Sequence, residues 1–359
     1  MIVFRSILLS SNLFIVGLTL LAYLSPMVKP QNFWVLQFVG MSYPFLLLFN
    51  VFFVVGWLLF RKRYFLISLS TILIGWSHFN NFIGFSFPEK SRSSKSLKVL
   101  TYNIDNFTHF QKGTEQTKRI AAFEKFIRSE DPDIICFQES FITTAEYSSR
   151  IKKFPVLAEY RYIFHPVEKG MVIFSKFPAT KTAKINMKED RVETANGANY
   201  ADVQIHGEIF RLLITHLQSN SVRERTADVI EDHFRSEETR QTALAVIKKI
   251  RDMSYFRAAQ SEAIHAFIKQ SPYPVIVAGD FNDTPQSYTY SQISNGLQDA
   301  FARKGSGLGI TYGGIIPGLR IDYILVDPKF KIISYKIPKV SFSDHYPVLA
   351  EIDLSAIHK

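Results

Sequence analysis

The spacing of apolar and polar positions divides the chain into two parts. The first 88 residues contain no Asp or Glu, and five basic residues separate three long uncharged spans, 6–28, 30–60 and 64–88. A helix needs roughly 20 apolar residues to cross the hydrocarbon core of a bilayer. We therefore predict a membrane region, residues 1–88, with three transmembrane helices at about 6–28, 33–60 and 64–86.

Two alternatives to this arrangement stay open. Arg5 precedes an apolar stretch, as in a signal peptide, but no small-residue cleavage site follows Leu24 and two further apolar spans come after it. The third span is the most polar, so a two-helix anchor is the other possibility. Trp76 is expected at the membrane interface, and His78 as an interfacial or helix-packing residue rather than a ligand.

Basic residues in the short loops predict the orientation. The turn 61–63, Arg-Lys-Arg, is expected in the cytoplasm and the loop with Lys29 outside, which sends the third helix outward. Four basic residues between 90 and 98 follow the third span, so the numbers of basic residues on the two sides of the membrane are nearly equal. The larger part of the protein is expected outside the cytoplasmic membrane, and a two-helix anchor would reverse its side.

The second part of the chain alternates strands and helices, which predicts an α/β domain from residue 97 to 359 after a Ser- and charge-rich linker at 89–96. The predicted strands are 97–104, 133–138, 160–165, 171–175, 200–206, 209–217, 275–278, 320–326, 331–337 and one that starts at Val348. The predicted helices are 114–129, a region at 220–270 that breaks near Met253 and Ser254, and a short helix from Ser287. A Gly-rich loop is expected at 305–318.

Polar side chains stand at the ends of these strands. The apolar run from Val275 to Ala278 is typical of a strand buried on both faces, and Asp280 and Asn282 follow it after a glycine. One such residue is as often a cap or turn residue, but the chain repeats the pattern. The residues at or beside predicted strand ends are Asn103, Glu139, His216, Asp280, Asn282, Asp322, Asp344 and His345.

These residue types favour a divalent-metal site. Carboxylate and amide oxygens are the ligands that a hard cation such as Mg²⁺ selects, whereas the single cysteine, Cys136, excludes a thiolate zinc set and any disulfide within the chain. Cys136 lies in an apolar run and is expected to be buried. Five of the 42 basic residues precede residue 89, so the α/β part carries a net charge of +5, which suits anionic substrates but is too small to indicate tight nucleic-acid binding.

The α/β part resembles the endonuclease/exonuclease/phosphatase superfamily, and among its members a membrane-anchored bacterial branch. The matching segments occur in the family's order between residues 97 and 353: Thr101-Tyr-Asn-Ile, Gln138-Glu139, Gly170-Met-Val-Ile-Phe-Ser-Lys-Phe-Pro, Thr215-His-Leu, Gly279-Asp-Phe-Asn-Asp, Ile321-Asp-Tyr-Ile and Ser343-Asp-His-Tyr-Pro. Each segment is weak alone, and the ordered set is specific.

The resemblance implies a role for each residue. Glu139 would be the main metal ligand, with Asn103 and Asp344 nearby, and Asp280 and Asn282 would complete a possible second metal position. His345, oriented by Asp322, would polarise the phosphate or activate the attacking water. Asp280 would share the proton transfer, Asn282 would hold a phosphate oxygen, and His216 would assist the leaving group or bind phosphate.

We therefore expect a four-layer α/β sandwich, like that of pancreatic deoxyribonuclease, in which two mixed sheets pack face to face between outer helices. The expected activity is Mg²⁺- or Mn²⁺-dependent hydrolysis of phosphodiesters, in nucleic acid or a phospholipid headgroup, on the periplasmic side of a bacterial inner membrane. A phosphomonoesterase and a catalytically silent binding module are the alternatives. Thr311 and Tyr312 are candidates for the border of the cleft, whereas the polar loops 186–199 and 218–225 are expected to be surface loops rather than substrate contacts. The histidines that match no motif are expected as surface or core residues, although His165 is also a candidate for the cleft: His109, His165, His206, His233, His265 and His358.

Overall fold

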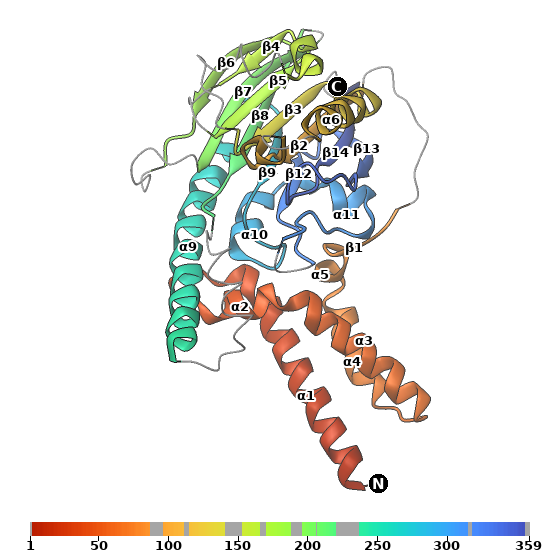
Figure 1. Ribbon diagram of the computed structural model, residues 1–359. Coiled ribbons are helices and arrows are strands. Elements are labelled where there is room, and N and C mark those ends of the chain that lie inside the picture. The colour runs from red at the N-terminus through yellow and green to blue at the C-terminus, as the bar shows by residue number, and fades with distance from the viewer. Residues whose placement is uncertain are drawn as a thin grey trace.

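The computed structural model describes residues 2–86, 96–110, 115–140, 153–165, 170–187, 196–205, 207–219, 237–314 and 318–355. Its main body is a sandwich of two six-stranded sheets, and a group of N-terminal helices lies at one end of that sandwich (Figure 1). His206, His233 and His358, much of the loops 186–199 and 218–225, and nearly all of the linker 89–96 lie outside the described residues.

The first sheet has the strand order β13-β14-β2-β3-β5-β4. Its one parallel pair is β2 with β3, and helix α6 connects these two strands, because a parallel pair needs a long crossover connection. The element bounds are β2 Ser96–Asn103, α6 Gln116–Glu130, β3 Ile134–Gln138, β4 Tyr162–Phe164, β5 Met171–Ser175, β13 Lys331–Lys336 and β14 Val348–Asp353, with the 3-10 helices η2 Asp105–Phe110 and η3 Pro155–Glu159.

The second sheet has the order β10-β12-β9-β8-β7-β6, and its parallel pair is β8 with β9. Helix α9, which precedes β9, runs along one side of the sandwich (Figure 1). The bounds are β6 Ala179–Lys184, β7 Gly197–Ile205, β8 Glu208–His216, α9 Glu237–Lys269, β9 Val275–Asp280, α10 Tyr288–Ser294, β10 Gln298–Asp299, α11 Ala300–Lys304 and β12 Asp322–Val326. Ser287 caps α10 by accepting a hydrogen bond from the Tyr290 amide.

Alternate residues of the central strands enter different cores, as the two-residue period of a strand requires. Val99 and Ile276 lie in the core between the two sheets. Leu100 faces the outer layer under α6, and Val277 faces the outer layer under α9 and α10. The predicted arrangement of two mixed sheets between helices is confirmed, and Cys136 is buried as a free thiol in the central core.

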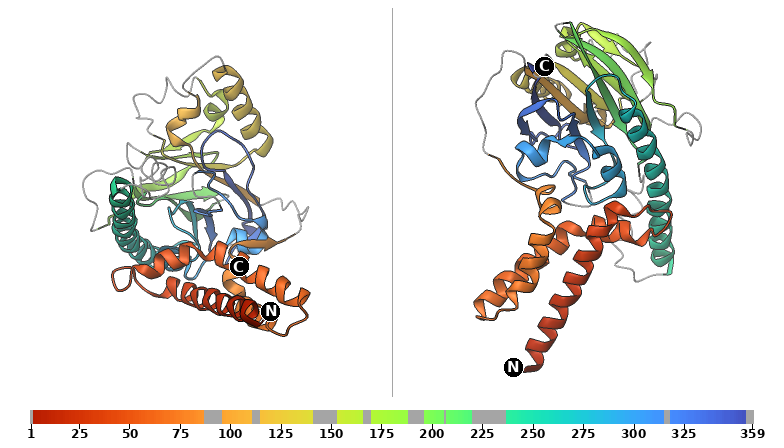
Figure 2. Two further views of the ribbon diagram at one scale, coloured as in Figure 1. Left: turned by 60° about the horizontal axis from the view of Figure 1, so that its bottom comes forward. Right: turned by 180° about the vertical axis from the view of Figure 1, so that it is seen from behind.

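The N-terminal helices differ from the predicted spans. They are α1 Ile2–Leu24, η1 Ser25–Met27, α2 Val35–Met41, α3 Tyr43–Leu59, α4 Phe65–Ile74 and α5 Trp76–Asn80. Within the described residues one helix, Val3–Met27, is long and apolar enough to cross a membrane, and α2 with α3 passes the same test only as a pair bent by 56°. Figures 1 and 2 show α1, α3 and α4 projecting away from the sandwich, with the N-terminus at the far end.

Two expectations about helix continuity are wrong. The span 64–86 is not one helix: α4 ends at Gly75, where the ring of Tyr23 occupies the space that a side chain would need, and the chain goes on as α5 and then strand β1, Ile83–Phe85. Helix α9 in turn continues through Met253 and Ser254, where a break was expected. Ser254 is buried in α9 and donates to the carbonyl of Arg251, so its hydroxyl is satisfied inside the helix.

The N-terminal helices and the sandwich are joined by direct contacts. Strand β1 pairs with β11, Ser306–Leu308, inside the loop that was predicted to be without strands. Lys29 Nζ lies 2.7 Å from Glu262 Oε1 on α9. His78 stacks on Tyr23 with ring centroids 4.8 Å apart, which confirms its packing role. The N-terminal helices therefore pack directly against the α/β domain.

Candidate active site

The strand register places three of the expected residues side by side. His216 on β8 is the partner of Asp280 on β9, and Asp280 is the partner of Asp322 on β12. The two parallel strands approach closely at Gly279, where a side chain would lie 2.0 Å from the Thr215 carbonyl and the φ angle is +151°. Only glycine fits there, so the glycine before Asp280 fixes how the carboxylate is presented.

Asn103 connects this edge to the first sheet. It ends β2, and its Nδ2 donates to Glu139 Oε1 and to Asp280 Oδ2, each at 3.1 Å. Glu139 follows β3 with a φ angle of +52°, a left-handed conformation that is unusual for glutamate. Such strain is typical of functional sites. The ends of both sheets thus meet in one site.

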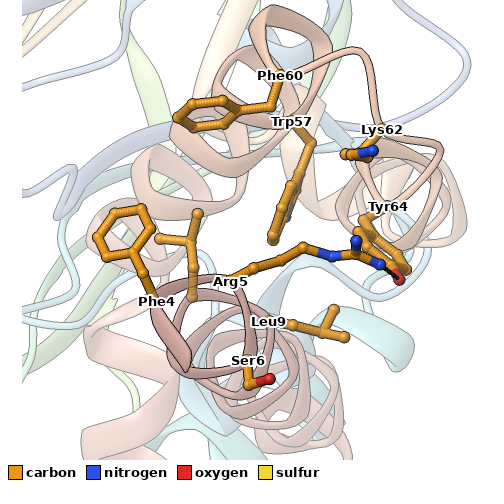
Figure 3. Close-up of a pocket in the computed structure, with 9 residues that line it drawn as sticks. Phe4, Arg5, Ser6, Leu9, Trp57, Phe60, Lys62 and Tyr64 are labelled. Carbon is orange, nitrogen blue, oxygen red and sulfur yellow. Dashed lines mark hydrogen bonds between the residues drawn. The ribbon is translucent and has the colours of Figure 1, made fainter. Parts of the chain in front are cut away.

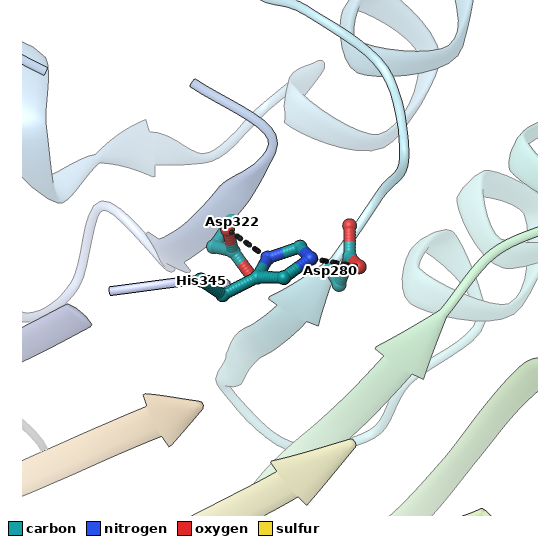
Figure 4. A group of neighbouring side chains, drawn as sticks. All are labelled: Asp280, Asp322 and His345. Atoms are coloured by element: carbon teal, nitrogen blue, oxygen red, sulfur yellow. Dashed lines mark hydrogen bonds and ion pairs between the residues drawn. The ribbon is translucent and has the colours of Figure 1, made fainter. Parts of the chain in front are cut away.

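His345 lies between two aspartates (Figure 4). Its Nδ1 is 3.0 Å from Asp322 Oδ2, and its Nε2 is 3.8 Å from Asp280 Oδ2. Thr311 supports this group, because its buried hydroxyl accepts hydrogen bonds from the amides of Ile321 and Asp322. Tyr312 forms an isolated antiparallel β-bridge with His345, and the centroids of their rings are 5.0 Å apart. Thr311 and Tyr312 therefore contact the group of Asp322 and His345.

The surroundings of Glu139 and Asp280 shift the pKa values of these two acids in opposite directions. Burial alone would raise the pKa of Glu139, but hydrogen bonds and charge from His216, the Asn103 amide and the charge of His345 lower it to about 2. Burial and the neighbouring Asp322 raise the pKa of Asp280 to about 6, although the two histidines act in the opposite direction. Glu139 is therefore a carboxylate at neutral pH, and Asp280 is the acid that protonates more readily.

Both histidines favour the cationic form. Burial lowers the pKa of His345, but Asp322, Asp280 and Asp344 together raise it to about 10. Burial likewise opposes charge on His216, while Glu139 and Asp280 raise its pKa above the usual value. His216 Nε2 lies 3.4 Å from Glu139 Oε1 and 3.9 Å from Asp280 Oδ2, so both carboxylates act on the same ring nitrogen.

The loop after β9 is held in place by groups that the sequence did not single out. Asn282 has a φ angle of +52°, and its Nδ2 donates to the Leu217 carbonyl at 3.1 Å. Asp283 pairs with the buried Arg257 at 3.2 Å and accepts from Thr289. Sequence reasoning missed Arg257 because α9 contains many charged residues, and nothing in the local sequence distinguishes the buried arginine from the exposed ones.

The structure brings together seven of the eight predicted residues: Asn103, Glu139, His216, Asp280, Asn282, Asp322 and His345. Asp344 precedes His345 on the same loop and acts on it through its charge. The metal-ligand and catalytic roles of all eight remain predictions.

The donor set fits a divalent cation. Ligand atoms of Asp280, Asp322 and His345 lie within 4.8 Å of one another, and the Glu139 carboxylate and Asn103 amide are on the same edge. Asp280 and Asp322 are buried neighbours of like charge, which the imidazolium of His345 between them or a bound cation offsets. Oxygen donors of this kind suit Mg²⁺ or Mn²⁺.

Comparisons with known proteins find relatives in sequence and in fold. The YbhP protein of Escherichia coli strain K12, which is uncharacterized, is 23% identical over 281 residues, covering 72% of this chain and 97% of YbhP. An endonuclease/exonuclease/phosphatase family protein from Bacteroides thetaiotaomicron is 18% identical in sequence and similar in fold, with a TM-score of 0.50 over 73% of this chain and 98% of that chain. The catalytic domain of human Nocturnin, with a bound sulfate anion, is 18% identical in sequence. Its fold matches with a TM-score of 0.50 over 75% of this chain and 96% of that chain.

Two family profiles match the chain. That of a domain of unknown function (DUF8431) matches residues 5–82, most of the N-terminal helical region. That of the Endonuclease/Exonuclease/phosphatase family matches residues 100–345, from within β2 to His345. This match covers more than half of the chain and includes all eight site residues. The chain therefore belongs to the endonuclease/exonuclease/phosphatase family of phosphoric-ester hydrolases.

Proposed function

We propose that this protein is a membrane-anchored, divalent-metal-dependent phosphodiesterase whose active site is the group around His345. The observation that carries the proposal is a buried group of three side chains, in which the imidazole of His345 lies between the carboxylates of Asp322 and Asp280. Such an arrangement gives a cation for a phosphate and, beside it, an acceptor for the proton of water.

The residues divide the work as follows. When bound, the divalent cation would offset charge on the phosphate oxygens, and Glu139, Asn103 and Asp344 are the residues we expect to hold it. His345, cationic and held by Asp322, would donate from Nε2 to a phosphate oxygen. Asn282 would hold another phosphate oxygen through its amide.

Asp280 is then the better candidate for the general base, because its raised pKa makes it a stronger proton acceptor than Glu139. As the water oxygen bonds to phosphorus and the ester P–O bond breaks, the water proton would pass to the Asp280 carboxylate. His216 would give its proton to the leaving oxygen. For His345 we therefore propose the phosphate-polarising role rather than activation of the water.

Membrane anchoring is supported by the inverted polarity of the N-terminal helices. Polar side chains lie inside: Asn12, which is buried, donates to Ser68 at 2.7 Å and accepts from Trp57 at 3.0 Å. Large apolar side chains lie outside, and among the described residues all the exposed ones belong to residues 3–85 except Leu244, Ile247 and Leu308. Polar contacts between apolar helices are typical of bundles that sit in lipid.

The distribution of basic residues supports a periplasmic catalytic domain. The start of α1, which carries Arg5, and the turn 61–63 between α3 and α4 lie at the end of the helices far from the sandwich (Figure 1). Lys29 instead pairs with Glu262 on α9 of the sandwich. The far end would then be cytoplasmic. An alkaline phosphatase reporter fused after Lys359 is expected to be active and one fused after Lys62 inactive. The reverse pattern would overturn this orientation.

The activity is tested with the purified full chain and Mg²⁺ or Mn²⁺ on bis-p-nitrophenyl phosphate, p-nitrophenyl phosphate, DNA and phospholipid vesicles. We expect hydrolysis of the diester, and its loss in Glu139→Ala and His345→Ala but not in the matched control His265→Ala. Unchanged hydrolysis in both site variants would exclude this site. Hydrolysis of the monoester alone would favour a phosphomonoesterase, and no hydrolysis of any ester would favour a binding module.

A further inference from the structure

A cavity lies among the N-terminal helices, lined by residues other than those of the candidate active site (Figure 3). It forms where the start of α1 meets the end of α3 and the turn before α4, and its volume is about 590 Å³. Its lining includes Phe4, Arg5, Leu9, Phe60, Lys62 and Tyr64.

Two cations enter this cavity without an acidic partner. Arg5 Nη2 donates to the Tyr64 hydroxyl at 2.6 Å, and the guanidinium lies over the Tyr64 ring at 5.2 Å from its centroid. Residues 1–88 contain no Asp or Glu, and in the described part of the chain neither Arg5 nor Lys62 forms an ion pair. Both side chains are exposed in the structure. At the headgroup level of a membrane, an anionic group from outside this part of the chain would offset their charge.

The rest of the lining is apolar. Phe4 and Phe60 are more than half exposed at its rim, and Trp57 is buried behind Tyr64 with ring centroids 5.1 Å apart. Figure 3 shows the Arg5 guanidinium and the Lys62 amine on the Tyr64 side, with Phe4 and Phe60 on the other. A ligand that fits both halves carries an anionic group and an apolar tail. Aromatic rings beside basic groups are also typical of the headgroup level of a membrane.

We propose that this cavity binds the phosphate-bearing headgroup of an anionic membrane phospholipid. Arg5 and Lys62 contact the phosphate, and Leu8, Leu9 and Phe60 contact the first part of the acyl chains. This inference rests on the proposed membrane insertion but not on the proposed catalytic activity. It places the lipid at the cytoplasmic end of the helices, so that the bound lipid is a structural ligand and not the substrate.

The test is a native mass spectrometry titration of the full chain in detergent with phosphatidylglycerol, and with phosphatidylcholine as the zwitterionic comparison. Each basic group near a membrane contributes enough for about a fivefold change in affinity, so Arg5→Gln and Lys62→Gln should each weaken phosphatidylglycerol binding about fivefold, and the double variant about 25-fold. Arg63→Gln is the matched control, since Arg63 is on the same turn but does not line the cavity. Its binding should be unchanged.

A second variant keeps the charges and fills the space. Leu9→Trp is expected to lose phosphatidylglycerol binding while it leaves hydrolysis of a soluble diester and the thermal unfolding temperature unchanged. Equal binding of phosphatidylcholine and phosphatidylglycerol by the unsubstituted protein would overturn the proposal. So would an equal loss in Arg63→Gln and Lys62→Gln, which would show attraction to the turn as a whole. Neither result would affect the catalytic proposal, which the soluble diester tests separately.

Discussion

Gln286 Nε2 donates a hydrogen bond to the carbonyl oxygen of Ala22, 3.2 Å away and 264 residues earlier in the chain. Both residues are completely buried. Gln286 belongs to the loop that begins after Asp280 and carries Asn282, and Ala22 lies in the last turn of α1. The N-terminal helices therefore form part of the support of the catalytic loop.

Replacing Gln286 by Ala tests this support. The Ala22 carbonyl would lose a buried partner, which costs about 1–3 kcal/mol of unfolding free energy, and diester hydrolysis should fall several-fold as Asn282 loses its fixed position. Gln31→Ala is the matched control, because Gln31 also joins the helices to the sandwich, by an exposed hydrogen bond of 3.2 Å to the Tyr255 carbonyl. Thermal unfolding and kcat measurements on both variants check this. Equal effects on kcat would mean that the loop has no special dependence on α1.

His345→Ala should lower kcat on the diester by about 10²–10⁴, the range expected when a positioned proton donor is lost. Asp322→Asn keeps the shape but removes the charge that holds His345 in its cationic form, so it should also lower kcat strongly. Single-turnover and steady-state rates measure both. If Asp322→Asn has full activity, the Asp322 to His345 pair does not act in the reaction.

The same pair predicts how stability depends on pH in the metal-free protein. The pKa of His345 is raised to about 10 in the folded state, so the stability that the pair contributes is fully present below about pH 6.5 and is lost as pH rises through about 10. In EDTA, the difference in unfolding free energy between the parent and Asp322→Asn should therefore be larger at pH 6 than at pH 10. Urea unfolding at the two pH values measures it. A difference that grows with pH would contradict the assignment.

Metal dependence gives a further test. EDTA should abolish diester hydrolysis, and Mg²⁺ should restore it and raise the thermal unfolding temperature, because a ligand that binds the folded state stabilises it. Glu139→Gln keeps the size of the side chain but removes its charge, so the Mg²⁺ concentration for half-maximal activity should rise at least about tenfold. Isothermal titration of Mg²⁺ checks the same change without turnover. Full activity in EDTA would exclude a metal-dependent site.

The sequence alone determined the α/β class, the buried strands and the residue types of the site. An apolar run such as 275–278 can only be a buried strand or a buried helix segment, and the glycine and polar residues that follow end it at the right place. Residues such as Asp322 and His345 were found because each stands beside a strand end, a feature that local sequence records. The short helix predicted from Ser287 is likewise a local property, and in the structure the Ser287 hydroxyl caps it.

The tertiary structure decided what local sequence does not record. The register of β8, β9 and β12 sets His216, Asp280 and Asp322 side by side, and Glu139, in a left-handed conformation, accepts a hydrogen bond from Asn103 on the neighbouring strand. The third apolar span was predicted as a helix because its composition is apolar, yet its last residues form β1 on β11. That pairing depends on a strand more than 200 residues away, and only the folded chain brings the two together.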